Sequence, residues 1–336
     1  MFDRLLKFVS VRPGPESQMH ELGPKGVRLP AWSTFAPAVK SAVMRAAPAI
    51  VAKGKWPFFA YAGFLATLAL TQKRFVFNPS NADCPMVPAT DTHEILELKL
   101  PVQGGSTLKG WLLRPEKPNL VNPAIIYYGG RSEEVSWLKG AARWFPAHVI
   151  LALNYRGYGE SDGDPTEKAF FMDGLDQFDW MTRQAGVDPK AVTLIGRSLG
   201  TGVASYVAAH RPAEKVVLIT PYDSILAVAR RRFWFTPLSL ILRHKFDSIA
   251  YAKRAAQPCL AVLAEHDDVV PATHTHKLLE AWRGDTKVVS ILGSDHYDIP
   301  YLPTTLAVVA EWLGYAAAIT KLPVTYSAMP NQVPTS

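Results

Sequence analysis

Short apolar runs alternate with helical stretches from about residue 90 to residue 316, and this alternation constrains the fold more than any other feature. Neighbouring parallel strands need crossover connections, so strands that alternate with helices predict a mostly parallel sheet with helices on both faces. The eight strand-like runs are 94–100, 108–114, 124–128, 149–155, 191–195, 215–219, 259–264 and 287–292. The helical stretches are 167–186, 200–210, 273–282 and 304–315, where apolar residues recur at helical spacing.

One serine stands between two glycines where the run 191–195 ends and a helical stretch begins, in Gly196-Arg-Ser198-Leu-Gly200. Chemistry in such sheets lies beyond the carboxyl ends of the strands. A serine on a strained strand-to-helix turn needs glycine two residues before and two after, because side chains there would clash with the backbone. The context favours Ser198 as a nucleophile, with Gly196 and Gly200 as the glycines of the turn. The alternative is an ordinary glycine-rich turn.

A serine hydroxyl is a weak nucleophile and needs a base that is oriented by a carboxylate. The run 259–264 leads into Asp267, and the run 287–292 leads into His296, so the chain order is Ser, Asp, His. We predict Asp267 as the orienting acid and His296 as the general base. The competing residues are Asp268 for the acid and His266, His274 and His276 for the base.

An oxyanion hole needs two backbone N–H groups that point at the developing negative charge. Leu199, directly after the candidate nucleophile, is expected to donate one. The second is expected from the loop after 124–128, from Gly130 or Arg131, with Arg131 preferred. The alternative is that Gly129 and Gly130 only make a tight turn.

The N-terminal part of the chain differs from the rest in charge and hydropathy. Residues 1–55 hold nine Lys and Arg against three acidic residues, which is nearly all of the net charge of +7. The main domain is therefore almost neutral, which argues against nucleic-acid binding. Residues 56–72 carry no charge and are flanked by Lys and Arg. A helix there covers roughly 25 Å, slightly less than a bilayer core, and it is expected to be a single-pass membrane anchor, with a buried core helix as the alternative.

Several segments together resemble the α/β-hydrolase superfamily, and in detail the membrane-anchored serine hydrolases related to the depalmitoylating hydrolase-domain proteins. The segments are QKRFVFNPS (72–80), YYGGRSEEVSW (127–137), NYRGYGESDGDPTE (154–167), LIGRSLGTGVA (194–204), PYDSILAVA (221–229), HKFDSIA (244–250), AEHDDVVP (264–271) and GSDHYD (293–298). The resemblance implies an α/β-hydrolase fold, with Ser198 as nucleophile, Asp267 as orienting acid and His296 as general base. Relatives commonly carry His-Gly at the oxyanion loop, where this chain has Tyr128-Gly129-Gly130-Arg131, and the departure leaves the second donor open.

A segment between the sixth strand and the acid strand is too apolar for a solvent loop. It contains Phe233, Trp234 and Phe235, which are expected to line a substrate pocket under a lid. The alternative is that they pack on the core or touch a membrane. The expected organisation is a basic segment at 1–55, an anchor helix at 56–72, a hydrolase domain at 73–320 with a lid at about 222–257, and an unstructured tail at 321–336.

The predicted activity is hydrolysis of a carboxylic ester or thioester, on a small-molecule or lipid-like acyl substrate, through an acyl-enzyme. No metal or organic cofactor is implied, and the two cysteines, Cys84 and Cys259, match no metal-ligand spacing. One alternative is a peptidase or amidase with the same triad. The other is a catalytically silent, membrane-attached interaction module that keeps the fold.

Overall fold

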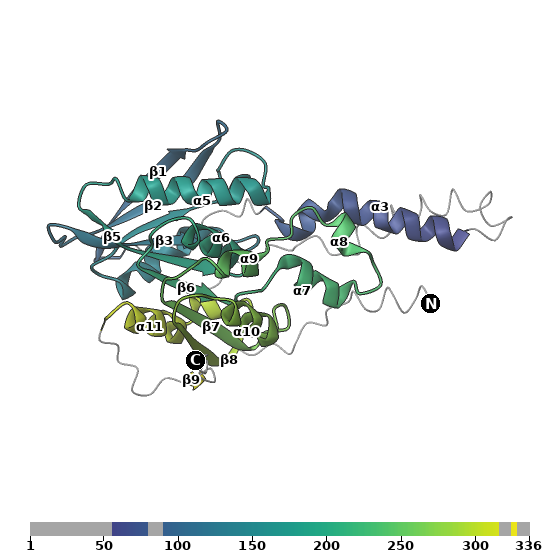
Figure 1. Ribbon diagram of the computed structural model, residues 1–336. Coiled ribbons are helices and arrows are strands. Elements are labelled where there is room, and N and C mark those ends of the chain that lie inside the picture. The colour runs from purple at the N-terminus through teal and green to yellow at the C-terminus, as the bar shows by residue number, and fades with distance from the viewer. Residues whose placement is uncertain (1–55, 80–89, 316–323, 328–336) are drawn as a thin grey trace, which may run out of the picture. The chain divides into compact units, whose positions relative to one another are not determined.

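The computed structural model describes residues 56–79, 90–315 and 324–327 (Figure 1). The basic segment 1–55 and Cys84 lie outside the described residues. Apart from the helix at its N-terminal end, the described chain is built around a single sheet.

The sheet has nine strands in the order β1-β2-β4-β3-β5-β6-β7-β8-β9. The strands from β4 through β3 to β8 pair in parallel, whereas β1, β2 and β9 pair with their neighbours in antiparallel fashion. The mostly parallel sheet predicted from the alternating runs is thus confirmed. The strands are β1 (His93–Pro101), β2 (Thr107–Pro115), β3 (Asn122–Tyr128), β4 (Val149–Leu153), β5 (Val187–Arg197), β6 (Lys215–Ile219), β7 (Cys259–His266), β8 (Thr286–Asp295) and β9 (Val324–Ser327).

The ninth strand corrects one expectation, because β9 lies in the tail predicted to be unstructured. Val324–Ser327 pairs antiparallel with Val288–Ile291 of β8. An edge strand presents a row of unpaired N–H and C=O groups, and β9 satisfies those of β8. Pairing with an edge is a tertiary contact, which explains why a four-residue segment between prolines showed no strand pattern.

Each face of the sheet buries its own apolar core, because successive strand side chains point to opposite faces. In β3, for example, Ile126 and Tyr128 belong to one core, and Ile125 and Tyr127 belong to the other. The first core contains residues of α5 (Glu167–Met181), α6 (Leu199–Ala208), α9 (Ser248–Ala252) and α10 (Ala272–Glu280). The second contains residues of α4 (Leu138–Ala141) and α11 (Pro303–Trp312), together with the 3-10 turns η2 (Val135–Trp137), η3 (Ala142–Trp144) and η4 (Ile299–Tyr301).

The segment expected as a lid leaves the sheet after β6 and contains α7 (Ile225–Arg232), α8 (Leu238–Ile241) and α9. A bridge between Ser224 and Asp247 joins the two ends of the excursion. The side chain of Ser224 also caps α7 by accepting a hydrogen bond from the Ala227 N–H at 3.0 Å. We call residues 225–246 the lid segment.

The apolar segment at 56–72 forms part of a longer helix, α3 (Trp56–Val76), which lies beside α8 in Figure 1. Its C-terminal end is fixed to the domain: Phe77 is fully buried, and Gln72 donates to the Ile241 carbonyl at 3.2 Å and accepts from the Arg243 N–H at 2.7 Å. The expectation of a membrane-spanning helix at 56–72 is not supported. Within residues 56–79, 90–315 and 324–327, none of the helices combines the length and the apolar character that crossing a membrane requires.

Candidate active site

Ser198 occupies the tight turn between β5 and α6. Its backbone has φ 48° and ψ −115°, a left-handed conformation that is rare for a residue with a side chain. The turn is held from both sides, because the Ser198 N–H donates to the Ile219 carbonyl at the end of β6 and the Ser198 carbonyl accepts from the Thr201 hydroxyl at 2.7 Å. The neighbouring strand and the helix together hold the strained residue in place.

The two flanking glycines are required by close backbone approaches. A Cβ on Gly196 would lie 2.5 Å from the Gly200 carbonyl oxygen, and a Cβ on Gly200 would lie 2.0 Å from the Tyr128 oxygen. No side chain fits at either position without moving the main chain. The packing therefore explains the G-x-S-x-G spacing, and it also fixes the turn against the end of β3.

The structure brings Ser198, His296 and Asp267 together in one chain of hydrogen bonds. The Ser198 Oγ lies 2.9 Å from the His296 Nε2, and the His296 Nδ1 lies 2.8 Å from the Asp267 Oδ2. The side chains of His296 and Asp267 are nearly fully buried, whereas Ser198 is partly exposed. In this arrangement Asp267 accepts the Nδ1–H of the imidazole, which leaves Nε2 free to accept the serine proton.

Local hydrogen bonds orient Asp267 and the turn that carries His296. The second carboxylate oxygen of Asp267 accepts from the N–H groups of Val269 and Val270, at 3.0 and 2.7 Å. The turn that carries His296 is closed by Asp295, whose Oδ1 accepts from the N–H groups of Tyr297 and Asp298 at 2.7 and 2.9 Å. Sequence reasoning missed this role of Asp295; the spacing of an Asp two and three residues before the donors is the signal that indicates such a turn.

The competing residues lie elsewhere. Asp268 and His266 are exposed, and His266 pairs with Glu265. His274 is buried against Asp223, with 2.8 Å between its Nδ1 and the Asp223 Oδ1. His276 lies on α10 and is half-buried. The hydrogen-bond chain from Ser198 runs through His296 and Asp267, and the choice among the candidates stays a prediction.

The expected oxyanion donors differ in what their N–H groups contact. Leu199 is the first residue of α6, so its N–H has no acceptor within the helix. The Gly130 N–H donates to the Glu133 carboxylate at 2.5 Å and is therefore engaged. The role of Arg131 as the second donor stays a prediction.

Phe233, Trp234 and Phe235, which were expected to line a substrate pocket, differ from one another in exposure and contacts. The Trp234 side chain is 81% exposed, and Phe235 stacks on Phe64 of α3 with 5.9 Å between ring centroids. Phe233 ends α7 and is partly buried. Because α3 packs on this segment, Trp234 and Phe235 form part of a surface with α3 instead of an enclosed pocket.

The described residues hold no group of three or more His, Cys, Asp or Glu side chains placed to bind a metal ion. Cys259 is fully buried in β7, and burial raises the pKa of its thiol.

Comparison with known proteins gives relatives of two kinds. No protein-family model matches the chain. The uncharacterized protein MT2364 of Mycobacterium tuberculosis (strain CDC 1551 / Oshkosh) is 28% identical over 70% of this chain and 84% of its own length. The lysophosphatidylserine lipase ABHD12 of Rattus norvegicus is 31% identical over a shorter stretch, 36% of this chain and 35% of that protein.

Among solved structures, Acetyl Xylan Esterase 1 from Thermoanaerobacterium sp. JW/SL YS485 superposes with a TM-score of 0.57, over 74% of this chain and 93% of that one. The sequence identity is 16%, so this likeness shows the fold alone. The chain has the α/β-hydrolase fold. The resemblance to α/β-hydrolases expected from the sequence is confirmed, whereas the membrane anchor is not. The named relatives are a lipase and, among solved structures, an esterase.

Proposed function

We propose that this α/β-hydrolase cleaves carboxylic esters or thioesters through an acyl-enzyme formed on Ser198. The observation that carries the proposal is the hydrogen-bond chain from the Ser198 Oγ through His296 to Asp267. The turn geometry supports it further, because a left-handed serine at a helix N-terminus costs stability and suits a functional role.

The reaction has two steps. The Ser198 Oγ attacks the carbonyl carbon while His296 Nε2 takes the serine proton, and the N–H groups of Leu199 and Arg131 stabilise the oxyanion. The tetrahedral intermediate breaks the bond to the alcohol or thiol, which leaves with the proton from His296. Water then attacks the acyl-enzyme with His296 as base, and the acid and free Ser198 are released. Asp267 keeps the imidazole in the correct tautomer throughout.

An apolar acyl group is the favoured substrate part. A lipase acting on a lysophospholipid is among the relatives, and apolar side chains cover the lid segment and α3 next to it. A peptide substrate has no comparable support, because no observation points to a pocket that would select a side chain.

The test is hydrolysis of p-nitrophenyl esters from acetyl to palmitoyl, with a fluorophosphonate probe in parallel. Ser198→Ala is compared with Ser239→Ala, which changes an exposed serine in α8. We expect Ser198→Ala alone to abolish labelling and to lower kcat by about 10³-fold or more. Wild-type protein that neither labels nor turns over would refute the proposal and favour the silent interaction module.

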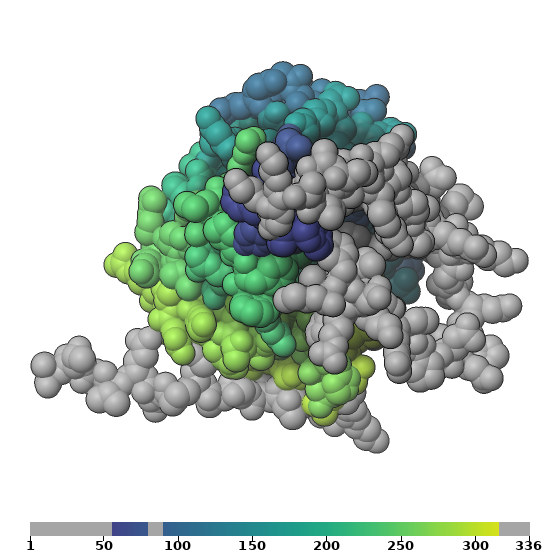
Figure 2. Space-filling view, turned by 90° about the vertical axis from the view of Figure 1, so that its right-hand side faces the viewer, coloured from purple at the N-terminus to yellow at the C-terminus, as the bar shows by residue number. Residues whose placement is uncertain are grey.

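We further propose that the protein associates with membranes through what we call the α3–lid surface, the exposed residues Phe58, Phe59, Leu70, Trp234 and Leu240. Leu70 and Leu240 are 85% and 86% exposed, so neither is explained by packing within the chain. Exposed apolar residues that lie together mark sites of interaction with a protein or a membrane. Figure 2 shows this side of the molecule, with α3 in purple beside the green lid segment. Three exposed arginines at 230–232 adjoin the apolar residues, and this pairing of aromatic and basic groups suits an anionic lipid surface.

Co-sedimentation of the full chain with phosphatidylcholine vesicles, with and without phosphatidylserine, tests the association. We expect Trp234→Ser and Leu240→Ser each to weaken binding on the order of tenfold, because each removes a side chain that would enter the interface. Leu120→Ser is the matched control, since Leu120 is 95% exposed in the loop between β2 and β3, outside the α3–lid surface. Equal binding by all three variants would contradict the proposal.

A further inference from the structure

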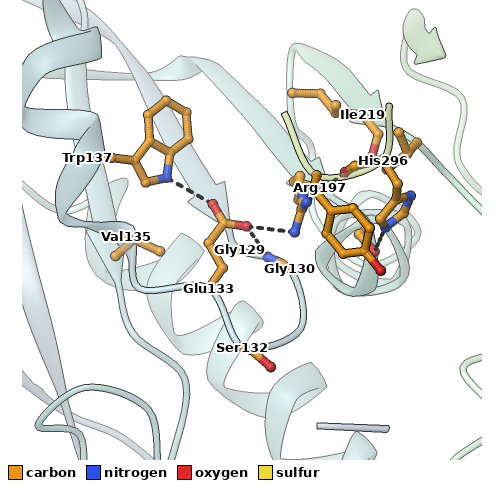
Figure 3. Close-up of polar contacts among 12 residues, drawn as sticks. Gly129, Gly130, Ser132, Glu133, Val135, Trp137, Arg197, Ile219 and His296 are labelled. Atoms are coloured by element: carbon orange, nitrogen blue, oxygen red, sulfur yellow. Dashed lines mark hydrogen bonds and ion pairs between the residues drawn. The ribbon is translucent and has the colours of Figure 1, made fainter. Parts of the chain in front are cut away.

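A buried carboxylate lies behind the oxyanion loop and collects four contacts. The Glu133 Oε1 accepts from the Tyr127 hydroxyl at 2.7 Å and from the Trp137 Nε1 at 2.9 Å. Its Oε2 accepts from the Gly130 N–H and lies 3.6 Å from the Arg197 Nη1 (Figure 3). The Glu133 side chain is 1% exposed, so these contacts replace the water that a carboxylate needs. Burial and the neighbouring carboxylate raise the pKa of Tyr127, which keeps its hydroxyl a donor.

The Arg197 guanidinium, which pairs with Glu133, also contacts the turn that carries His296. Arg197 is the last residue of β5, directly before Ser198, and its side chain is 7% exposed. Its Nη2 donates to the backbone carbonyl of His296 at 2.8 Å. The pair therefore connects the oxyanion loop, the end of the nucleophile strand and the His296 turn.

The oxyanion loop is shaped to receive the guanidinium. A Cβ on Gly130 would lie 2.4 Å from the Arg197 Nη1 and 2.8 Å from its Cδ. Glycine at this position is required for the close approach, and the Gly130 N–H is committed to Glu133. The contact fixes the backbone on which Arg131 presents its own N–H.

We propose that Arg197 and Glu133 are positioning residues that hold the oxyanion loop and the His296 backbone in register with Ser198. This inference rests on the proposed function. Neither residue touches the reacting atoms; each acts through a backbone group of the machinery. Displacement of a catalytic group by about 1 Å can cost on the order of 10²-fold in rate, so loss of either contact should lower kcat more than it raises KM.

Three variants separate positioning from mere stability. Arg197→Lys keeps the buried charge pair, but its single ammonium cannot reproduce the two-ended contact to Glu133 and His296. Glu133→Gln leaves a buried guanidinium without its carboxylate, which lowers Tm. The double variant Arg197→Met with Glu133→Gln removes both charges, so Tm should recover relative to Glu133→Gln.

The matched control is Arg156→Lys. Arg156 pairs with the fully buried Asp173 through bonds of 2.6 and 2.7 Å. Its other hydrogen bonds go to Ser106 and to the Gln103 carbonyl, away from the proposed triad. It therefore reports what the loss of an arginine fork in a buried pair does to the fold alone. We expect a lower Tm and a kcat within about twofold of the wild type.

The measurements are Tm, kcat and KM on the preferred p-nitrophenyl ester, together with fluorophosphonate labelling. We expect kcat of Arg197→Lys to fall on the order of tenfold to a hundredfold with KM nearly unchanged. In the double variant we expect Tm to recover while kcat stays low. Recovery of kcat together with Tm, or wild-type kcat in Arg197→Lys, would overturn the positioning role. Absent labelling in the wild type would instead refute the proposed function and this inference with it.

Discussion

A buried histidine should make the free energy of unfolding fall as the pH drops from 7 to 5. His148 precedes β4 and is 5% exposed. Its Nδ1 lies 2.6 Å from the Tyr315 hydroxyl, which also accepts from the Ala147 N–H at 3.1 Å. The hydroxyl can therefore donate its own proton to Nδ1, an arrangement that suits the neutral ring. Burial, with smaller contributions from Lys215 and His93, lowers the pKa of His148 from 6.5 to about 4.

The sign and the size of the effect follow from that difference. Below pH 6.5 the unfolded chain binds a proton at this histidine and the folded chain does not, so stability is complete above pH 6.5 and is lost as the pH falls toward 4. At about 1.36 kcal/mol per pKa unit, the free energy of unfolding should drop by roughly 2 kcal/mol between pH 7 and pH 5 through His148 alone.

Urea denaturation of the wild type and of His148→Gln at both pH values measures this contribution. Gln keeps a polar group that can accept from Tyr315 but does not titrate. We expect the decrease on going from pH 7 to pH 5 to be smaller in His148→Gln by roughly 2 kcal/mol. His93 also has a lowered pKa because of burial, but it is present in both proteins and cancels in the comparison. An equal decrease in the two proteins would refute the reasoning.

Three further predictions concern the site and its surroundings. Gly200→Ala should abolish activity and destabilise the fold by at least about 2 kcal/mol in urea denaturation, because its Cβ would overlap the Tyr128 carbonyl; Gly63→Ala, whose Cβ meets no atom within 4 Å, should leave both unchanged. Asp267→Asn should lower kcat/KM by about 10³- to 10⁴-fold through loss of the correct tautomer, whereas Asp268→Asn should stay within about twofold in the same ester assay, and equal losses would contradict the assignment. In a Cys84→Ser background, a thiol reagent should modify Cys259 only in denaturant, because the thiol is fully buried; rapid modification of the native protein would show that β7 opens.

The sequence predicted the sheet well because its signals are local. Each of the eight expected runs coincides with a strand, since an apolar run bounded by turn residues is read within a few positions. The sequence also predicted that Ser198, Asp267 and His296 lie close together, because the loops that follow parallel strands lie at the same edge of the sheet. The position of residues 233–235 could not be predicted from the sequence. It depends on packing between the lid segment and α3, which is more than 150 residues away along the chain.

Arg197 shows where a sequence argument can be extended. Strand side chains alternate, so Arg197 shares a face with Ile195 in the core that also contains Tyr127. Both faces of a central parallel strand are covered by helices, and an arginine there must therefore be buried and needs a carboxylate partner. The G-x-S-x-G motif restricts the glycines and the serine but leaves the position before the serine open. A charged residue at that open position, on a strand that is otherwise apolar, indicates that a buried acid lies nearby. Here that acid is Glu133, which pairs with Arg197 and also accepts a hydrogen bond from Trp137.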